Sequence, residues 1–379
     1  MKLKYIGFLF LLLGLQLYGQ NDKNVKAYKR MEGKIGEKID VTANFIQLFG
    51  KVKGNYQYKF EKRRADEVTT YYGKMIELNG ELYDDDSVRF KEAGSGDYTI
   101  KGVWGVDFFN GKWKIPGEDD YMDMMLKEYY PDGSLPFKVY YLESDQKLIP
   151  ARKDSPTATL ELTFIYPSGN FKTPEAEAKV KKTIVKSFFG DGIKPEVPDK
   201  MLRDFESEYY KMYADNKENW LEIGGSSFSW EMMKSMNVKF NSDYLLSIEY
   251  FRYAYSGGAH GMENLSYDVF NLATGKKLEY QDIFTESADT VLSALLTEKM
   301  IEKYKTKNGS TLKEVGFFVD TIEPNNNIYV TGNGVGFQYS SYEIAPYSFG
   351  LPEVFLDFDE VKDLLRKDSP VYKLTGRQR

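Results

Sequence analysis

The sequence predicts an α+β protein: an N-terminal all-β meander, curled into a small barrel or sandwich, followed by an α+β domain with an antiparallel sheet and about three helices. Short strand-like runs separated by Gly, Asn and Asp fill residues 28–116. After Thr157, apolar residues at helical spacing alternate with strand-like runs. The 30 Tyr and 25 Phe suit β-rich exported folds. Helices grouped before and between strands argue against a parallel doubly wound sheet.

Alternating apolar runs define the strands of the first domain, expected over residues 20–117. These strands are predicted at 41–48, 54–58, 75–82, 87–90, 98–108 and 112–115. Asn110-Gly111 lies between two aromatic runs and predicts a hairpin turn, since both positions of that turn need positive φ. Asp84–Ser87 lacks the spacing of an EF-hand calcium loop and is interpreted as a solvated turn.

Residues 118–154 are expected to connect the two domains. Tyr121, Met124, Met125 and Tyr129 have the spacing of one helical face, which predicts a short helix over 119–129. A strand is predicted at 137–142.

Helix-start signals organise the α+β domain, expected over residues 155–379. Thr173 as N-cap, Pro174 at the first helical position and Gly190 as terminator delimit the first helix. The other helices are predicted from 198, over 288–304, and briefly up to 365. Strands are predicted at 159–166, 228–240, 244–254, 265–272, 276–278, 328–330, 334–339 and 353–358. Gly332-Asn333 lacks the Lys-Ser/Thr of a phosphate loop and predicts a hairpin.

The N-terminus has the pattern of a secretory signal. Lys2 and Lys4 precede an apolar run over 6–17, and Gly19 offers a small residue for cleavage. An uncleaved anchor is the alternative. No second apolar run approaches the ~18 residues of a spanning helix, so no stable membrane insertion is expected after cleavage. The product is expected to be exported, either periplasmic or secreted.

The composition argues against several classes of partner and catalytic site. The formal net charge of −6, with both signs interspersed, argues against nucleic acid and is compatible with a cationic protein partner. With no Cys and one His, disulfides and most histidine- or thiol-based catalysis are unavailable. A zinc site is not expected, nor is any cofactor, whereas a calcium site made of carboxylates alone remains open.

The single histidine lies in Tyr255-Ser256-Gly257-Gly258-Ala259-His260-Gly261, directly after an apolar strand. Its glycines permit positive φ or close backbone approach, so the loop is interpreted either as held to the core by His260 or as a ligand-contacting surface. As a catalytic alternative, Ser256 and His260 would act as nucleophile and base, oriented by Asp268 or Glu263. No Gly-x-Ser-x-Gly elbow is present to support it.

Three segments carry a family resemblance: 253–261, then 270–278 together with Asp282-Ile283-Phe284, and 342–350 with Ala345-Pro346-Tyr347 at its centre. Their order and spacing resemble the paired extracytoplasmic domains of RsiV-like anti-sigma factors and PdaC-like peptidoglycan deacetylases, over about residues 157–365. The first half resembles β-meander domains of exported Bacteroidetes proteins.

The resemblance implies an exported α+β binding module, since some members recognise lysozyme and others accompany a cell-wall hydrolase domain. The chain lacks the histidines of the deacetylase metal site, and its N-terminus is interpreted as a signal rather than a sigma-binding segment. We therefore expect a non-enzymatic recognition module for a lysozyme-like protein or a cell-wall ligand such as a peptidoglycan fragment. The expected contact residues are Tyr255, Ser256, Gly257, Gly258, His260, Tyr342, Pro346 and Tyr347. A cell-wall hydrolase or esterase using Ser256 and His260, and a structural or inhibitor component of an envelope complex, are the alternatives.

Overall fold

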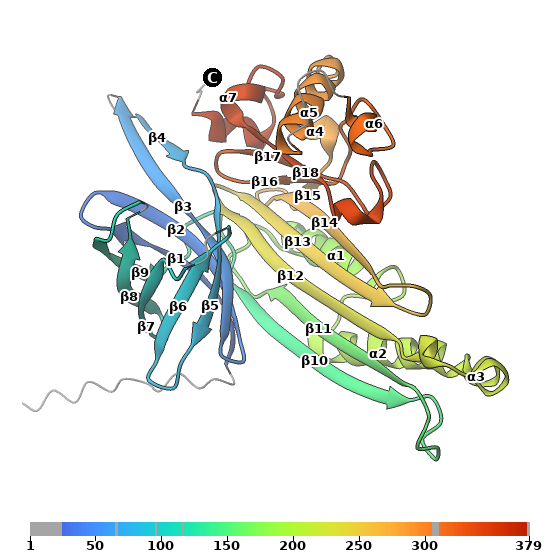
Figure 1. Cartoon of the computed structure of the whole chain (residues 1–379). Helices are drawn as coiled ribbons and strands as arrows, with labels where there is room; N and C mark the ends of the chain where they lie inside the picture. The colour runs from blue at the N-terminus through green and yellow to red at the C-terminus, as the bar shows by residue number, and fades with distance from the viewer. Residues whose placement is uncertain (1–24, 65–66, 95–96, 116, 305–310, 377–379) are drawn as a thin grey trace, which may run out of the picture.

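A computed structural model describes residues 25–64, 67–94, 97–115, 117–304 and 311–376. The predicted signal segment, residues 1–19, lies outside the described residues. The rest forms a β-barrel followed by an α+β half with two further sheets, so the predicted fold class is confirmed (Figure 1). Within these ranges, no helix is long and apolar enough to cross a membrane.

The barrel is built from consecutive antiparallel strands. They are β1 (Lys26–Ile35), β2 (Ile39–Leu48), β3 (Lys51–Arg64), β4 (Glu67–Tyr72), β5 (Ile76–Leu82), β6 (Ser87–Glu92), β7 (Ile100–Trp104), β8 (Phe108–Lys114) and β9 (Tyr121–Glu128). Their order is β2-β1-β9-β8-β7-β6-β5-β3-β4, and β2 also pairs with β3, which closes the ring. Inward-facing aromatic residues, among them Trp104, Phe90 and Phe109, fill the interior.

Two local predictions in this half were wrong. The stretch predicted as a helix over 119–129 is strand β9, in which Met124 and Leu126 are buried while Met125 between them is exposed. That is a period of two, and barrel closure against β1 and β8 decides it. Asn110-Gly111 lies within β8, not at a turn, and the chain reverses before Phe108, whose carbonyl accepts from the amide of Gly105. Gly111 is opposite Gly102, where two backbones approach too closely for side chains.

The α+β half begins with a six-stranded sheet in the order β10-β11-β12-β13-β14-β15. Its strands are β10 (Phe137–Lys147), β11 (Thr157–Pro167), β12 (Glu231–Ser242), β13 (Leu245–Tyr255), β14 (Met262–Asn271) and β15 (Lys276–Leu278). Only β11 and β12 pair in parallel, because helices α1 (Pro174–Phe189), α2 (Pro198–Ala214) and α3 (Lys217–Ile223) lie between them in the chain. Helices α1 and α2 pack on one face of the sheet (Figure 1).

Helix α1 follows the local signals of its sequence. The Thr173 hydroxyl accepts from the amide of Ala176, Pro174 opens the helix, and Gly190 ends it at φ +90°. Val180 and Ile184 face the core, which they share with alternate residues of β11. The predicted helix start, end and buried face are therefore confirmed.

The C-terminal part forms a second core beside the sheet. A three-stranded sheet of β16 (Ile328–Val330), β17 (Gly334–Gln338) and β18 (Glu353–Asp357) packs with α5 (Asp289–Lys303). The short helices are α4 (Tyr280–Ile283), α6 (Leu312–Val315), α7 (Phe358–Val361) and the 3₁₀ helices Ser226–Phe228, Tyr347–Phe349 and Pro370–Thr375. The predicted hairpin at Gly332-Asn333 is confirmed, since β16 and β17 pair on either side of it.

The barrel and the sheet meet at a polar seam centred on Arg30, which is 1% exposed. Its Nε donates to the Asn241 carbonyl at 2.7 Å, and its Nη2 donates to Ser242 Oγ at 2.7 Å. Asn241 in turn donates to the Tyr28 hydroxyl at 2.9 Å. These bonds join β1 of the barrel to the end of β12, so the two halves are fixed to one another by directional contacts.

Two lysines, one buried and one half-buried, predict a pH dependence of stability. Burial lowers the pKa of Lys29 to about 8. The pKa of Lys234 is also lowered to about 8, mainly by burial and to a smaller extent by the positive charge of Arg252. Both titrate near 10.5 when unfolded, so the folded chain holds these protons more weakly. Each lysine should therefore add about 2 kcal/mol to the free energy of unfolding between pH 7 and 9.5, as measured in urea titrations. Above pH 10 the free energy of unfolding should fall, because tyrosines ionise only in the unfolded chain.

The double variant Lys29→Met/Lys234→Met removes both groups and is expected to flatten the rise between pH 7 and 9.5. Exposed Lys38→Met is the matched control and should keep the rise. A rise of the same size in the double variant would show that other groups cause it.

Candidate functional site

Three rings from two distant segments stack against one another on the surface. The imidazole of His260 lies 4.0 Å, centroid to centroid, from the ring of Tyr347, with an interplanar angle of 24°. The ring of Tyr342 follows at 6.1 Å and 27°. The structure thus brings together the glycine–histidine loop and the 342–350 segment, the two regions that the sequence marked.

The glycine loop is shaped by its backbone. Gly257 and Gly258 adopt φ of +107° and +99°, which side chains rarely tolerate. The Gly258 carbonyl accepts from the Tyr255 hydroxyl at 3.1 Å. His260 Nδ1 lies 2.9 Å from the carbonyl of Gly261, so one ring nitrogen is used to hold the loop. A Cβ on Gly261 would lie 2.4 Å from the Tyr253 ring, so that ring packs directly on the glycine.

The second segment is held from beneath. Tyr342 adopts φ +66°, and its hydroxyl lies 3.5 Å from His260 Nε2. Pro346 precedes the 3₁₀ helix Tyr347–Phe349 through a trans bond. Phe349 packs on Phe317 at 4.8 Å between ring centroids, which anchors the segment to the C-terminal core.

The stacked rings continue onto the open face of the sheet. Tyr253 and Tyr255 share one face of β13, and their partners across the sheet are Glu263 on β14 and Glu231 on β12. The pKa of Tyr253 is raised, first by partial burial and then by its interactions with Glu231, Tyr347 and Glu263. These groups therefore lie close enough to Tyr253 to interact with it electrostatically.

We call this surface the aromatic platform; it comprises Tyr253, Tyr255, His260, Tyr342 and Tyr347. Tyr342 is 49% and Tyr347 36% exposed, and both carboxylates at the rim are exposed. Ser256, also predicted as a contact residue, is exposed in the adjoining loop.

The arrangement gives no support to Ser256 and His260 as a catalytic pair. In the structure no hydrogen bond joins these two side chains, and His260 instead contacts Gly261 and Tyr342. Asp268, considered as the orienting acid, is buried on β14, where it accepts from the Tyr250 hydroxyl at 2.8 Å and pairs with Lys277 at 2.9 Å.

Within the described ranges, no group of three or more His, Cys, Asp or Glu is placed to hold a metal ion. Asp85 in the turn considered as a calcium loop accepts from the amide and hydroxyl of Ser87. This is the local hydrogen bonding of an ordinary turn.

A charged cluster at the seam was not predicted. Lys239 lies 2.5 Å from Glu77 Oε1 and 2.9 Å from Glu249 Oε2, and Tyr267 donates to Glu249 at 3.0 Å. The pairing of β12 with β13 shifts register between Val238 and Phe240, so Lys239 is the extra residue of a β-bulge, and this aims its side chain at the barrel. Burial disfavours the charged form of both residues, but the attraction between them is stronger. The pKa of Lys239 is therefore raised and the pKa of Glu249 is lowered.

Comparisons with known families agree with this architecture. Residues 154–263 match the family model described as deacetylase PdaC, and residues 281–359 match that of a protein of unknown function, DUF3298. The predicted resemblance is confirmed. The glycine–histidine loop falls in the first match and Tyr342 to Tyr347 in the second, so the aromatic platform forms where the two matched segments meet.

A solved structure shows the same fold over part of the chain. A DUF3298 family member from Bacteroides fragilis is 22% identical, with a TM-score of 0.60 over 65% of this chain and 99% of that one. A DUF3298 family protein from Pseudomonas aeruginosa is 17% identical, with a TM-score of 0.44 over 64% of this chain and 98% of that one. No curated protein matches the chain.

Proposed function

We propose that the chain is an exported, non-enzymatic recognition protein that binds a basic protein of the lysozyme class through the aromatic platform. The observation that carries the proposal is the stack of His260, Tyr347 and Tyr342, held open to solvent by two anchored segments. Tyrosine supplies large contact area at low cost in side-chain entropy and is enriched in protein interfaces.

Charge favours a cationic partner over a neutral one. Glu231 and Glu263 flank the platform, and the whole chain carries a formal charge of −6. Complementary charge speeds encounter and selects against acidic partners. A peptidoglycan fragment would use the rings alone, with its sugars stacked on them, and is the ligand against which the proposal is tested.

Calorimetric titration of lysozyme into the mature chain is expected to give saturable binding. Tyr347→Ala should weaken it about 30-fold, because truncating a central aromatic contact commonly costs about 2 kcal/mol. Tyr121→Ala on the barrel, also an exposed tyrosine, is the matched control and should leave the affinity unchanged. Glu231→Gln/Glu263→Gln should weaken binding most at low salt.

Results with other ligands could contradict the proposal. Binding of peptidoglycan fragments alone, with the same loss in Tyr347→Ala, would make the ligand a glycan, and silence with both would remove the named ligands. Turnover of chromogenic esters or muropeptides that is lost in Ser256→Ala and His260→Ala would establish hydrolase chemistry instead.

A further inference from the structure

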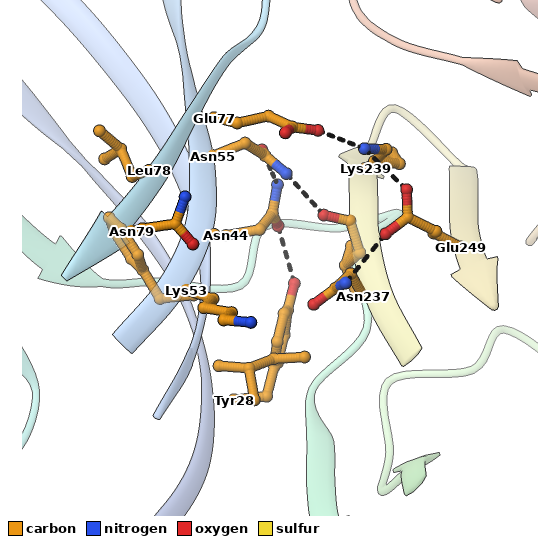
Figure 2. A pocket seen from close by; sticks show the side chains of 14 residues that line it. Tyr28, Asn44, Lys53, Asn55, Glu77, Leu78, Asn79, Asn237, Lys239 and Glu249 are labelled. Carbon is orange, nitrogen blue, oxygen red and sulfur yellow. Dashed lines mark hydrogen bonds and ion pairs between the residues drawn. The ribbon is translucent and has the colours of Figure 1, made fainter. Parts of the chain in front are cut away.

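A polar cavity of about 190 Å³ lies at the seam between the barrel and the six-stranded sheet (Figure 2). Strands β1, β2, β3 and β5 form one wall, and β12 and β13 form the other. Four asparagines line it: Asn44, Asn55, Asn79 and Asn237. It lies apart from the aromatic platform, with no lining residue in common. A molecule bound here would contact both halves of the chain.

Part of the lining is fixed by its own hydrogen bonds. Tyr28 donates to Asn44 Oδ1 at 2.8 Å, and Asn44 donates to Asn55 Oδ1 at 3.2 Å. Asn55 donates across the seam to the carbonyl of Val238 at 2.7 Å. This relay holds the back of the cavity in one arrangement, as Figure 2 shows. The cavity is therefore pre-formed.

Other polar groups that face the cavity have hydrogen-bond donors or acceptors that the protein itself does not use. Among the described residues, neither the Lys53 ammonium nor the Asn79 amide has a hydrogen-bond or ion-pair partner. Asn237 donates to Glu249 at 2.9 Å, which leaves its carbonyl oxygen to accept. Lys53 extends from the barrel strand toward Tyr28 and Asn237 (Figure 2). Donors and acceptors thus converge from both walls.

The charges of the lining balance. Lys53 and Lys239 are matched by Glu77 and Glu249, and Lys239 already neutralises both carboxylates in part. The cavity therefore offers directional hydrogen bonds without a net field that would select an anion or a cation. Its volume corresponds to about six water molecules at ~30 Å³ each.

We infer that the cavity is a binding site for one neutral, hydroxyl-rich molecule of the size of a single sugar ring. An asparagine amide donates and accepts at once, which matches adjacent hydroxyl groups, and the Tyr28 ring and Ile46 supply the apolar contact that such a ring needs. Because both walls contact the ligand, its binding stabilises the arrangement of barrel and sheet.

Ligand-observed NMR titrations of the full mature chain with glucose and N-acetylglucosamine test the inference, with glucuronate and glucosamine as charged counterparts. The neutral sugars are expected to bind and to raise the melting temperature, and the charged ones to bind more weakly. Asn79→Ala should weaken binding about fivefold, the effect of one ordinary hydrogen bond. Asn79→Trp should block the cavity, and the exposed barrel residue Asn110 supplies the control Asn110→Ala.

Three results would overturn the inference: no binding of either neutral sugar, tighter binding of glucuronate or glucosamine, or unchanged binding in Asn79→Trp that is folded by circular dichroism. Tyr347→Ala separates this site from the aromatic platform and should leave sugar binding unchanged. Loss of sugar binding in that variant would place the sugar on the platform, which also contradicts the inference.

Discussion

Lys239→Met is expected to lower the free energy of unfolding by about 3–5 kcal/mol. The substitution keeps the volume of the side chain but removes the only cation between Glu77 and Glu249 in the described part of the chain. Glu249 would then remain as a buried, unpaired carboxylate, and desolvation of an uncompensated charge is costly. Urea denaturation followed by tyrosine and tryptophan fluorescence measures the change.

A second substitution separates charge from packing. Lys239→Met/Glu249→Gln removes both charges, while the glutamine carbonyl can still accept from Asn237 and its amide nitrogen can donate to the Tyr267 hydroxyl oxygen. The double variant should recover most of the lost stability. If it is as unstable as Lys239→Met, the packing of the lysine stem, and not the stranded carboxylate, is responsible.

Arg30→Met is expected to cost about 3 kcal/mol and to loosen the barrel against the sheet. The guanidinium donates to Asn241, Ser242 and Tyr129, and the loss of each of these three bonds costs about 1 kcal/mol net. Denaturation should therefore become less cooperative, with barrel tryptophans and the α+β half reporting different midpoints.

Exposed Arg89, which lies over the ring of Tyr83, supplies the matched control. Arg89→Met should change stability by less than about 0.5 kcal/mol. A single sharp transition in Arg30→Met, with the stability of the unsubstituted chain, would show that the seam does not depend on this side chain.

The elements that could be predicted are those whose signals are local. Thr173, Pro174 and Gly190 define α1 by their own backbone chemistry, and Gly332-Asn333 marks a hairpin with strands on both sides. The turn predicted at Asn110-Gly111 was wrong because its glycine is required by a contact between strands and not by a local turn. A barrel needs glycines where two strands approach closely, so a dipeptide that usually forms a turn can lie inside a strand. Strand β9 was missed because methionine and tyrosine fit helical and alternating patterns equally.

The residues of the aromatic platform could be predicted in part from the sequence, whereas those of the seam could not. The resemblance marked His260, Tyr342 and Tyr347, yet only the fold stacks their rings. Glu77 and Lys239 are 162 residues apart and meet through a β-bulge, which no periodic pattern reveals. The same holds for the cavity beside them, since its two walls come from different halves of the chain.

Hydrogen–deuterium exchange of the chain from residue 20 onward, with and without lysozyme, tests whether lysozyme docks on the aromatic platform. We expect slower amide exchange at residues 256–261 and 340–349 in the complex, with β6 to β8 of the barrel unchanged. Protection confined to the barrel, or no change in either of the two segments at saturating lysozyme, would contradict the assignment of the aromatic platform as the docking surface.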